Sequence, residues 1–475
     1  MLKSAILLLS LLLPGVLCAD TLDCTAYTLR PEHTTVAPPQ SDSFLLEVTA
    51  DTAARSYLFA TFHSADSAVL TTWSGLAPLL ARMQPRVVVV ERDLADSTGM
   101  ARQLLPADSR LSALLSAVPG LFDATQALLK HYRLPADNAE RLQPWFVGAL
   151  LAQAPALPRH RSERILDQVL WDTARTLALP TKTLEDFSAI ADYYEHQFSR
   201  DEQIRLLAEA VCNQALLTQA VQQQTAAYAA NDVDTFYSLL HEFDGSDPAL
   251  STKLLDVFVR QRNAQFWHKL WPEIQQGGAF IAIGGLHLFG EDGLLPRLRE
   301  QPGVTLRAIE PASLHFTLTV AERPEALKWV LNRTQDMGLT TMTKAQLASA
   351  TMVHVPLSEL RERLCPGRLC QIESSYSAVD QTLLFRDDIF ARLLLQPTPA
   401  TRNIRAYADS LLVRELMRHA LSGSLQTAQA SAKCINNAIL HLASLAQHDY
   451  LREHQVHAKS HLFPLDSRCP ALELR

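Results

Sequence analysis

The 475-residue chain has little of what several protein classes require. It has no cluster of Lys and Arg, and its 43 basic residues are outnumbered by 50 acidic ones. The resulting net charge of −7 argues against nucleic acid as a partner. After residue 13 no apolar run is long enough to span a bilayer, so we expect no stable transmembrane segment in the mature chain. With 48% hydrophobic residues the chain is also not of the disordered class.

The first 19 residues are typical of a cleaved secretory signal peptide. Residues 1–13 place one positive charge before an apolar run, and a proline-glycine pair follows. Cleavage after Cys18 or Ala19 predicts a periplasmic or secreted protein. Lipid anchoring at Cys18 is the weaker alternative, because Leu17 fits a lipoprotein signal poorly.

Cysteine is scarce, but an even number remains after removal of the signal peptide. In an oxidising compartment an even number favours disulfides over metal thiolates. Cys365 and Cys370 flank a Pro-Gly turn and are predicted to pair with each other, because a zinc knuckle would need a second cysteine pair at similar spacing. The pairing of the others stays open: Cys24, Cys212, Cys434 and Cys469.

The length predicts two domains after the signal peptide, residues 20–320 and residues 321–475. Hydrophobic patterns in the first domain predict several strands, at residues 43–50, 56–62, 86–90, 279–284 and 304–309. Helical periodicity dominates between about 95 and 275. These patterns indicate an α/β fold with a mixed sheet and a large helical insertion, followed by a smaller, mainly helical C-terminal domain.

Two segments of the first domain share the order strand, histidine, helix, strand, glutamate. One contains His63 and Glu91, and the other contains His287 and Glu310. Side chains beyond the carboxyl ends of strands line the ligand crevice of open α/β sheets, so we expect both histidines at such a site. The alternative is coincidence, because β-α-β units are common in this fold class.

Glu91 closes an otherwise apolar strand, where a buried carboxylate is costly unless a metal or an arginine lies beside it. His63, His287 and Glu91 together form a plausible ligand set for a divalent ion such as Mn, Co or Zn. Such an ion would lower the pKa of bound water and polarise a carbonyl, which indicates hydrolysis. The alternative is that each histidine is an ordinary core or surface residue.

The same residues carry a resemblance to a known family. Ala60-Thr-Phe-His63, Glu91 and Gly284-Gly-Leu-His287 resemble the paired Gly-x-x-His motifs and intervening glutamate of the TraB/GumN family, which includes the Tiki metalloproteases. Thr183-Leu-Glu185 and Arg260-Gln-Arg-Asn263 are similar to two further family segments. The resemblance runs from about residue 43 to residue 311.

The resemblance implies a fold related to the erythromycin-esterase and ChaN-like group, with metal-dependent hydrolysis in the Tiki branch. It also implies metal binding by His63, Glu91 and His287. The residues that it places in the catalytic cleft are Glu91, Glu185, Arg262 and Asn263. One position departs from the motif, because Ala60 stands where the family has glycine. Its methyl group is expected to tighten a turn or to narrow the pocket.

The C-terminal domain contains a helix, from about residue 404 to residue 421, that resembles the active-site helix of a zincin. Arg414 and Arg418 replace the two histidines and flank Glu415, and guanidinium groups do not ligate zinc. A later segment at Gln447 is similar to the helix that supplies the third zincin ligand. We therefore interpret this domain as an inactive zincin-like module, with an ordinary salt-bridged helical extension as the alternative.

The leading hypothesis is an exported metal-dependent hydrolase that acts on peptides. The alternative is a non-catalytic protein that captures a peptide or a saccharide in the same cleft, which Ala60 and the altered C-terminal module both favour. A third hypothesis is a scaffold whose C-terminal helices bind a partner chain.

Overall fold

The structure is a computed structural model that describes residues 22–31, 39, 41–51, 54–93, 100–134, 136–158, 163–338, 343–366, 370, 372–377, 379–425, 431–458, 462–464 and 466. The predicted signal peptide (residues 1–19, with Cys18) and Cys469 lie outside the described residues. Within these ranges, no helix combines the length and apolarity that crossing a bilayer requires.

A six-stranded mixed sheet forms the centre of the N-terminal region (residues 22–314). Its strands, in the order β5-β4-β7-β3-β2-β8, are β5 (Thr181–Thr183), β4 (Val87–Val90), β7 (Ala279–Gly284), β3 (Ser56–Thr61), β2 (Leu45–Thr49) and β8 (Thr305–Ile309). Strands β5, β4, β7 and β3 run parallel, whereas β2 is antiparallel to both β3 and β8. The prediction of an α/β fold with a mixed sheet is confirmed.

The strand sequences explain the interior of this sheet. Strand β4 consists of four valines, and all four are buried. A continuous β-branched run suits a parallel strand that is covered on both faces. Strand β5 was not predicted, because its three residues are polar and largely exposed at the sheet edge.

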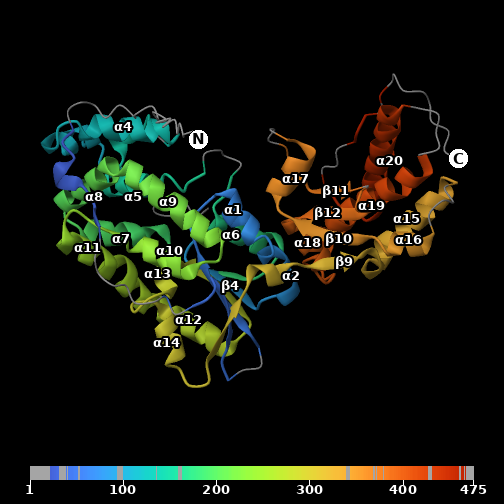
Figure 1. Ribbon diagram of the computed structural model, residues 1–475, viewed down its shortest axis with the longest axis horizontal. Coiled ribbons are helices and arrows are strands. Elements are labelled where there is room, and N and C mark those ends of the chain that lie inside the picture. The colour runs from blue at the N-terminus through green and yellow to red at the C-terminus, as the bar shows by residue number, and fades with distance from the viewer. Residues whose placement is uncertain are drawn as a thin grey trace, which may run out of the picture.

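Helices fill the N-terminal region between and around the strands (Figure 1). They are α1 (Ser67–Thr72), α2 (Leu76–Met83), α3 (Leu111–Leu114), α4 (Leu121–His131), α5 (Pro144–Gln153), α6 (Leu166–Thr176), α7 (Phe187–Gln197), α8 (Arg200–Cys212), α9 (Gln214–Ala229), α10 (Val233–Leu240), α11 (Pro248–Leu255), α12 (Arg262–Gln276), α13 (Gly285–Leu288) and α14 (Leu294–Arg299). A short ribbon pairs β1 (Arg30–Pro31) with β6 (Phe243–Asp244). The predicted helical insertion therefore lies between β4 and β7.

The C-terminal region (residues 317–466) has its own sheet and its own hydrophobic core. The sheet, which was not predicted, has the order β11-β12-β10-β9, with β9 (Thr317–Thr319), β10 (Thr351–Val355), β11 (Ser374–Ser377) and β12 (Thr382–Arg386). The helices are α15 (Pro324–Asp336), α16 (Lys344–Ala348), α17 (Leu357–Leu364), α18 (Asp387–Leu394), α19 (Arg402–Leu425) and α20 (Ala432–Glu453). Helix α18 packs against α2, which joins this orange-to-red lobe to the rest of the chain (Figure 1).

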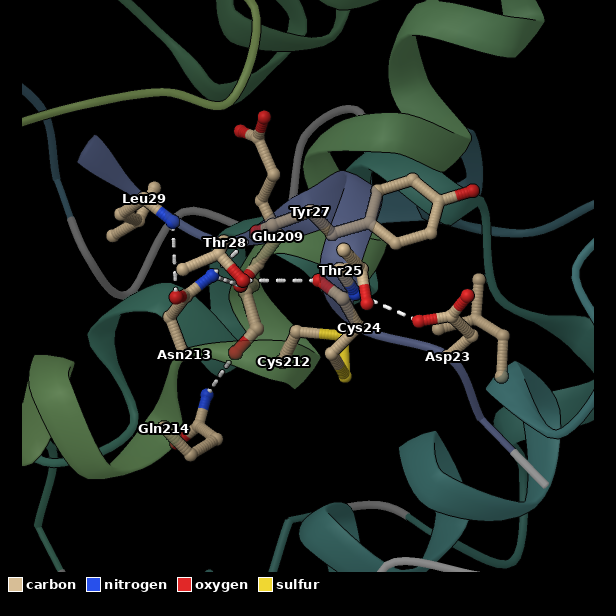
Figure 2. Close-up of a disulfide and its surroundings, with 12 residues drawn as sticks. Asp23, Cys24, Thr25, Tyr27, Thr28, Leu29, Glu209, Cys212, Asn213 and Gln214 are labelled. Atoms are coloured by element: carbon tan, nitrogen blue, oxygen red, sulfur yellow. Dashed lines mark hydrogen bonds between the residues drawn. A yellow bond between two sulfur atoms is a disulfide. The ribbon is translucent and has the colours of Figure 1, made fainter. Parts of the chain in front are cut away.

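Two disulfides link described residues. Cys24 bonds to Cys212 at the end of α8, and the Asn213 side chain next to it holds the backbone of Tyr27 and Leu29 (Figure 2). This bridge ties the N-terminal segment to the helical insertion. The predicted bond between Cys365 and Cys370 is also present, so that prediction is confirmed.

Candidate functional site

The candidate site lies at the carboxyl edge of the four parallel strands. His63 follows β3 by two residues, Glu91 follows β4 directly, and Glu185 follows β5 by two residues. His287 lies in α13, directly after β7. Because parallel strands end at the same edge, the topology brings these residues together from sequence positions more than two hundred residues apart.

Arg262 is the central cation of the site. Its guanidinium group donates to Glu91 Oε2 at 3.0 Å and to both carboxylate oxygens of Glu185, with 3.1 Å between Nε and Oε2. It also donates through Nη1 to His287 Nε2 at 2.9 Å. Arg262 and both carboxylates are largely buried, so the attraction between these opposite charges must compensate for their lost contact with water.

A π-helical turn, Asp256–Gln261, places Arg262 at the start of α12. π-Helical turns are rare in proteins, but those that occur are frequently found at functional sites. The Phe258 carbonyl accepts a hydrogen bond from Arg262 Nη1 at 3.2 Å. The local backbone therefore helps to aim the guanidinium group at the sheet edge.

His287 is held by the next residue of α12. Its Nδ1 donates to Asn263 Oδ1 at 2.7 Å, because Nε2 already accepts from Arg262. The Asn263 amide nitrogen donates to the Asp292 carbonyl at 2.7 Å, which fixes the orientation of the amide. His287 Nε2 lies 4.0 Å from Glu91 Oε1.

Gly284 allows the Glu91 carboxylate to approach the backbone closely. Its N–H donates to Glu91 Oε1 at 2.5 Å, and a Cβ at this position would lie 3.0 Å from the same oxygen. Glycine therefore has a specific role in the second motif. Ala60, at the matching position of the first motif, lies inside β3 and is fully buried in the main core. The expectation that its methyl group tightens a turn or narrows the pocket is wrong, because the group packs in the hydrophobic core.

His63 has a different partner, Asp167, which was not predicted. Its Nδ1 lies 2.8 Å from Asp167 Oδ2, and the hydroxyl of Thr61 donates to the other oxygen of Asp167 at 2.6 Å. His63 Nε2 has no hydrogen-bond partner among the residues that the structure describes. Asp167 belongs to the first turn of α6 and to no recognisable motif, so the only available sequence signal was an acidic residue at a helix start.

The environment separates the pKa values of the two histidines. The Asp167 carboxylate raises the pKa of His63 to about 9, so this ring is positively charged at neutral pH. Burial lowers the pKa of His287 to about 4, so this ring is neutral.

The two carboxylates beside Arg262 also differ. Burial opposes the charge on Glu91, but the attraction of Arg262 and His63, together with the hydrogen bond from the Gly284 N–H, holds its pKa well below the usual range. Since His287 is neutral, Arg262 is the constant positive charge in this set. Burial raises the pKa of Glu185 despite its contact with Arg262. Strongly perturbed groups gathered at a sheet edge are typical of functional sites.

Glu310 does not join the site. Strand β8, which precedes it, lies at the far edge of the sheet, and the Glu310 carboxylate accepts from Asn231. Of the two segments with the order strand, histidine, helix, strand and glutamate, both therefore bring their histidine to the site, but only the first also brings its glutamate.

The zincin-like helix corresponds to α19, which packs against α20. Glu415 is fully buried and accepts from Arg414 Nε at 2.9 Å and from Arg418 Nη1 at 2.8 Å. Arg414 also reaches Gln447 of α20, with 3.3 Å between Nη1 and Oε1. The guanidinium groups thus neutralise Glu415.

A family model settles the relationship of the N-terminal region. The model of the TraB/PrgY/gumN family matches residues 44–307, more than half of the chain. The chain belongs to the TraB/PrgY/gumN family. Comparisons with curated proteins and with solved structures gave no significant match. The matched segment of this TraB/PrgY/gumN member contains both histidines, Arg262 and all their partners, whereas the C-terminal region lies outside it.

Proposed function

We propose that the chain is an exported, metal-dependent hydrolase that acts on peptides, with its site at the carboxyl edge of the main sheet. One observation carries this proposal. Each histidine holds its Nδ1 against an oxygen, from Asp167 or from Asn263. Partners of this kind fix metal-binding imidazoles and direct Nε2 toward the ion.

The donor set is chemically suited to a divalent transition metal. Neutral His63 Nε2, His287 Nε2 and the Glu91 carboxylate are ligand types that Zn, Mn and Co accept, and binding would require His63 to release the proton that Asp167 favours. Within the described residues, however, no three His, Cys, Asp or Glu side chains converge as a metal cluster. Arg262 contacts His287, Glu91 and Glu185 at once, so an ion must compete with its guanidinium group for His287.

A bound ion would supply a water molecule of lowered pKa and polarise a substrate carbonyl. The chain's own residues hold the parts in position. Asp167 orients His63 and Asn263 orients His287. Arg262 keeps Glu91 ionised and fixes it beside His287. Glu185 anchors the other side of the guanidinium group.

Several finer features belong to the same proposal. The disulfides support export to an oxidising compartment, as the signal-like residues 1–19 predict. The mixed sheet is compatible with the erythromycin-esterase and ChaN-like arrangement. The contact between Arg414 and Gln447 supports an inactive zincin-like origin for the C-terminal region, because it joins the two helices that would carry zinc ligands.

The test has a metal arm and an activity arm. Elemental analysis of the mature protein is expected to give about one divalent ion per chain, and His63→Ala or His287→Ala should remove it. Glu91→Gln should lower hydrolysis of quenched-fluorescent peptides by about a hundredfold. Glu47→Gln is the matched control, because Glu47 is a buried, arginine-paired carboxylate on β2 of the same sheet. Stoichiometric metal in both histidine variants would contradict the proposed ligands.

Glu415→Gln separates the two regions. Activity per folded molecule should stay within about a few-fold of wild type, because Arg414 and Arg418 replace the zincin histidines. The fold should be less stable, since Glu415 is the shared acceptor of both guanidinium groups. Loss of hydrolysis in folded Glu415→Gln, with Glu91→Gln fully active, would move the chemistry to the C-terminal region.

The second candidate is a binding protein without catalysis. The observation that favours it is the closed network around Arg262, in which His287 Nε2 already has a donor. A protein of this kind would show no hydrolysis in any variant, yet its affinity for a peptide or a saccharide would fall in Arg262→Met.

A further inference from the structure

A cavity of about 900 Å³ lies between the N-terminal and C-terminal regions, away from the Arg262 network. Its N-terminal wall comes from α1, α2, α6 and α9, and its C-terminal wall comes from the starts of α17 and α18. A volume of this size is within the range of pockets that enclose a ligand of drug size.

The two walls differ in chemistry. The N-terminal wall is rich in apolar side chains, which include Leu70, Trp73, Leu76, Leu170 and Val221. The C-terminal wall presents Arg361, Arg386, Asp387 and Asp388. An occupant that matches both walls has an apolar body and a polar or charged end.

The carboxylates of the C-terminal wall already have cationic or N–H partners. Asp387 accepts from His354 Nδ1 at 2.8 Å. Asp388 accepts from Arg386 and from Arg392.

The N-terminal wall carries more negative than positive charge, because Asp66, Glu163 and Asp172 line it beside Arg164. Asp66 caps α1 by accepting from the Ala68 N–H, and Asp172 lies on the exposed rim. Glu163 and Arg164 bring opposite charges.

Arg361 is the cation of the C-terminal wall that has no carboxylate partner within the described residues. Its Nε donates to the Cys370 carbonyl at 3.0 Å, and within the described residues it forms no ion pair. The disulfide between Cys365 and Cys370 closes the loop after α17 and so holds this carbonyl in place. The guanidinium group is thereby positioned, and since no residue of the described ranges accepts from its Nη groups, we expect them to reach an anion in the cavity.

We propose that this cavity binds an anionic amphiphile. The acyl or similar apolar body lies against the helices of the N-terminal region, and the anionic head pairs with Arg361. The cavity also touches the first site indirectly, because Ser64 and Leu166 line it and directly neighbour His63 and Asp167 in sequence. The proposal does not depend on hydrolytic activity.

The probe is cis-parinaric acid, an 18-carbon polyene fatty acid whose fluorescence rises on burial, with its methyl ester as the uncharged counterpart. We expect saturable binding of the acid at about one site per full-length mature chain. Arg361→Gln should weaken binding of the acid by about tenfold or more, because one charge-assisted contact is lost. It should leave the ester nearly unchanged. Displacement by palmitate or by palmitoyl glycerol phosphate then distinguishes a carboxylate head from a phosphate head.

The matched control is Arg363→Gln, two residues along the same helix, where the guanidinium group is paired with Glu359. It should leave both affinities within about twofold. Val169→Trp, which adds bulk at a half-buried lining position, should abolish binding of acid and ester alike. Absence of saturable binding, equal losses in Arg361→Gln and Arg363→Gln, or undiminished binding in Val169→Trp would overturn the proposal.

Discussion

His63 and His287 are each the last residue of a similar four-residue motif, yet they differ in exposure and in charge. The His63 side chain is 40% exposed and faces the carboxylate of Asp167. The His287 side chain is 6% exposed and lies between a neutral amide and a guanidinium group. One ring is therefore charged at neutral pH and the other is neutral.

The difference shows that a motif can specify position without specifying protonation. Both histidines follow parallel strands, so both reach the same sheet edge. Their pKa values depend on burial and on Asp167, Asn263 and Arg262, which come from helices elsewhere in the chain. The two halves of the site can consequently be perturbed separately.

The largest effect is expected on the buried side. Arg262→Met leaves Glu91 and Glu185 buried without their cation, which should cost about 3–5 kcal/mol of unfolding free energy in urea titrations. Arg260→Met is the control on the preceding turn, because its pair with Asp292 is exposed and should contribute less than about 1 kcal/mol. Similar losses in both variants would mean that the Arg262 network does not depend on burial.

A smaller effect is expected where the second motif needs glycine. Gly284→Ala places a methyl group 3.0 Å from Glu91 Oε1 and should displace the carboxylate, at a cost of about 1–3 kcal/mol. The NMR shifts of His287 should change with it. Ala60→Gly should cost about 1 kcal/mol through the flexibility of β3 and leave the His287 signals unmoved. An unchanged His287 spectrum in Gly284→Ala would show that Glu91 does not rely on this close approach.

The smallest effect on stability is expected on the exposed side, where the change appears in titration. In metal-free protein, Asp167→Asn should lower the pKa of His63 from about 9 toward 6.5, while that of His287 stays near 4. The raised pKa of His63 stabilises the folded state at pH values below 6.5, and this stabilisation is lost as the pH rises through 9. In Asp167→Asn, the free energy of unfolding should therefore change less between pH 6.5 and pH 9 than it does in the wild type. NMR titration of both rings provides the measurement.

Asp172→Asn is the control for this titration, because Asp172 is an exposed carboxylate on the same helix as Asp167. It should leave both histidines unchanged. If His63 still titrated near pH 9 in Asp167→Asn, a group other than Asp167 would be the cause of its raised pKa.

Much of the sheet could be predicted, because most of its strands have a recognisable local pattern of hydrophobic residues. The valines of β4 and the apolar run of β7 are continuous and bounded by polar residues. Strands β5 and β11 were missed, because TKT and SSYS contain no apolar run of their own and are stabilised by pairing with neighbours. Strands β10 and β12 do contain apolar residues, but the prediction of a mainly helical C-terminal domain overlooked them.

Part of the site could be predicted as well, because Glu91 interrupts an apolar strand and must find a compensating charge. The compensating charge was expected from a metal or an arginine, and in the structure Arg262 supplies it. Asp167 was missed because it lies 104 residues from His63 and local spacing does not reveal such a contact.

The sequence by itself determined the parallel strands, the family and the residues that reach the sheet edge, because these depend on local hydrophobic order and on motifs within single segments. Only the tertiary structure decided which imidazole is positively charged, why a methyl group at Gly284 would crowd Glu91 while that of Ala60 packs in the core, and that Arg361 lines a cavity between the two regions. These properties arise from distances between segments far apart in the chain, and both electrostatic energy and steric overlap depend on such distances.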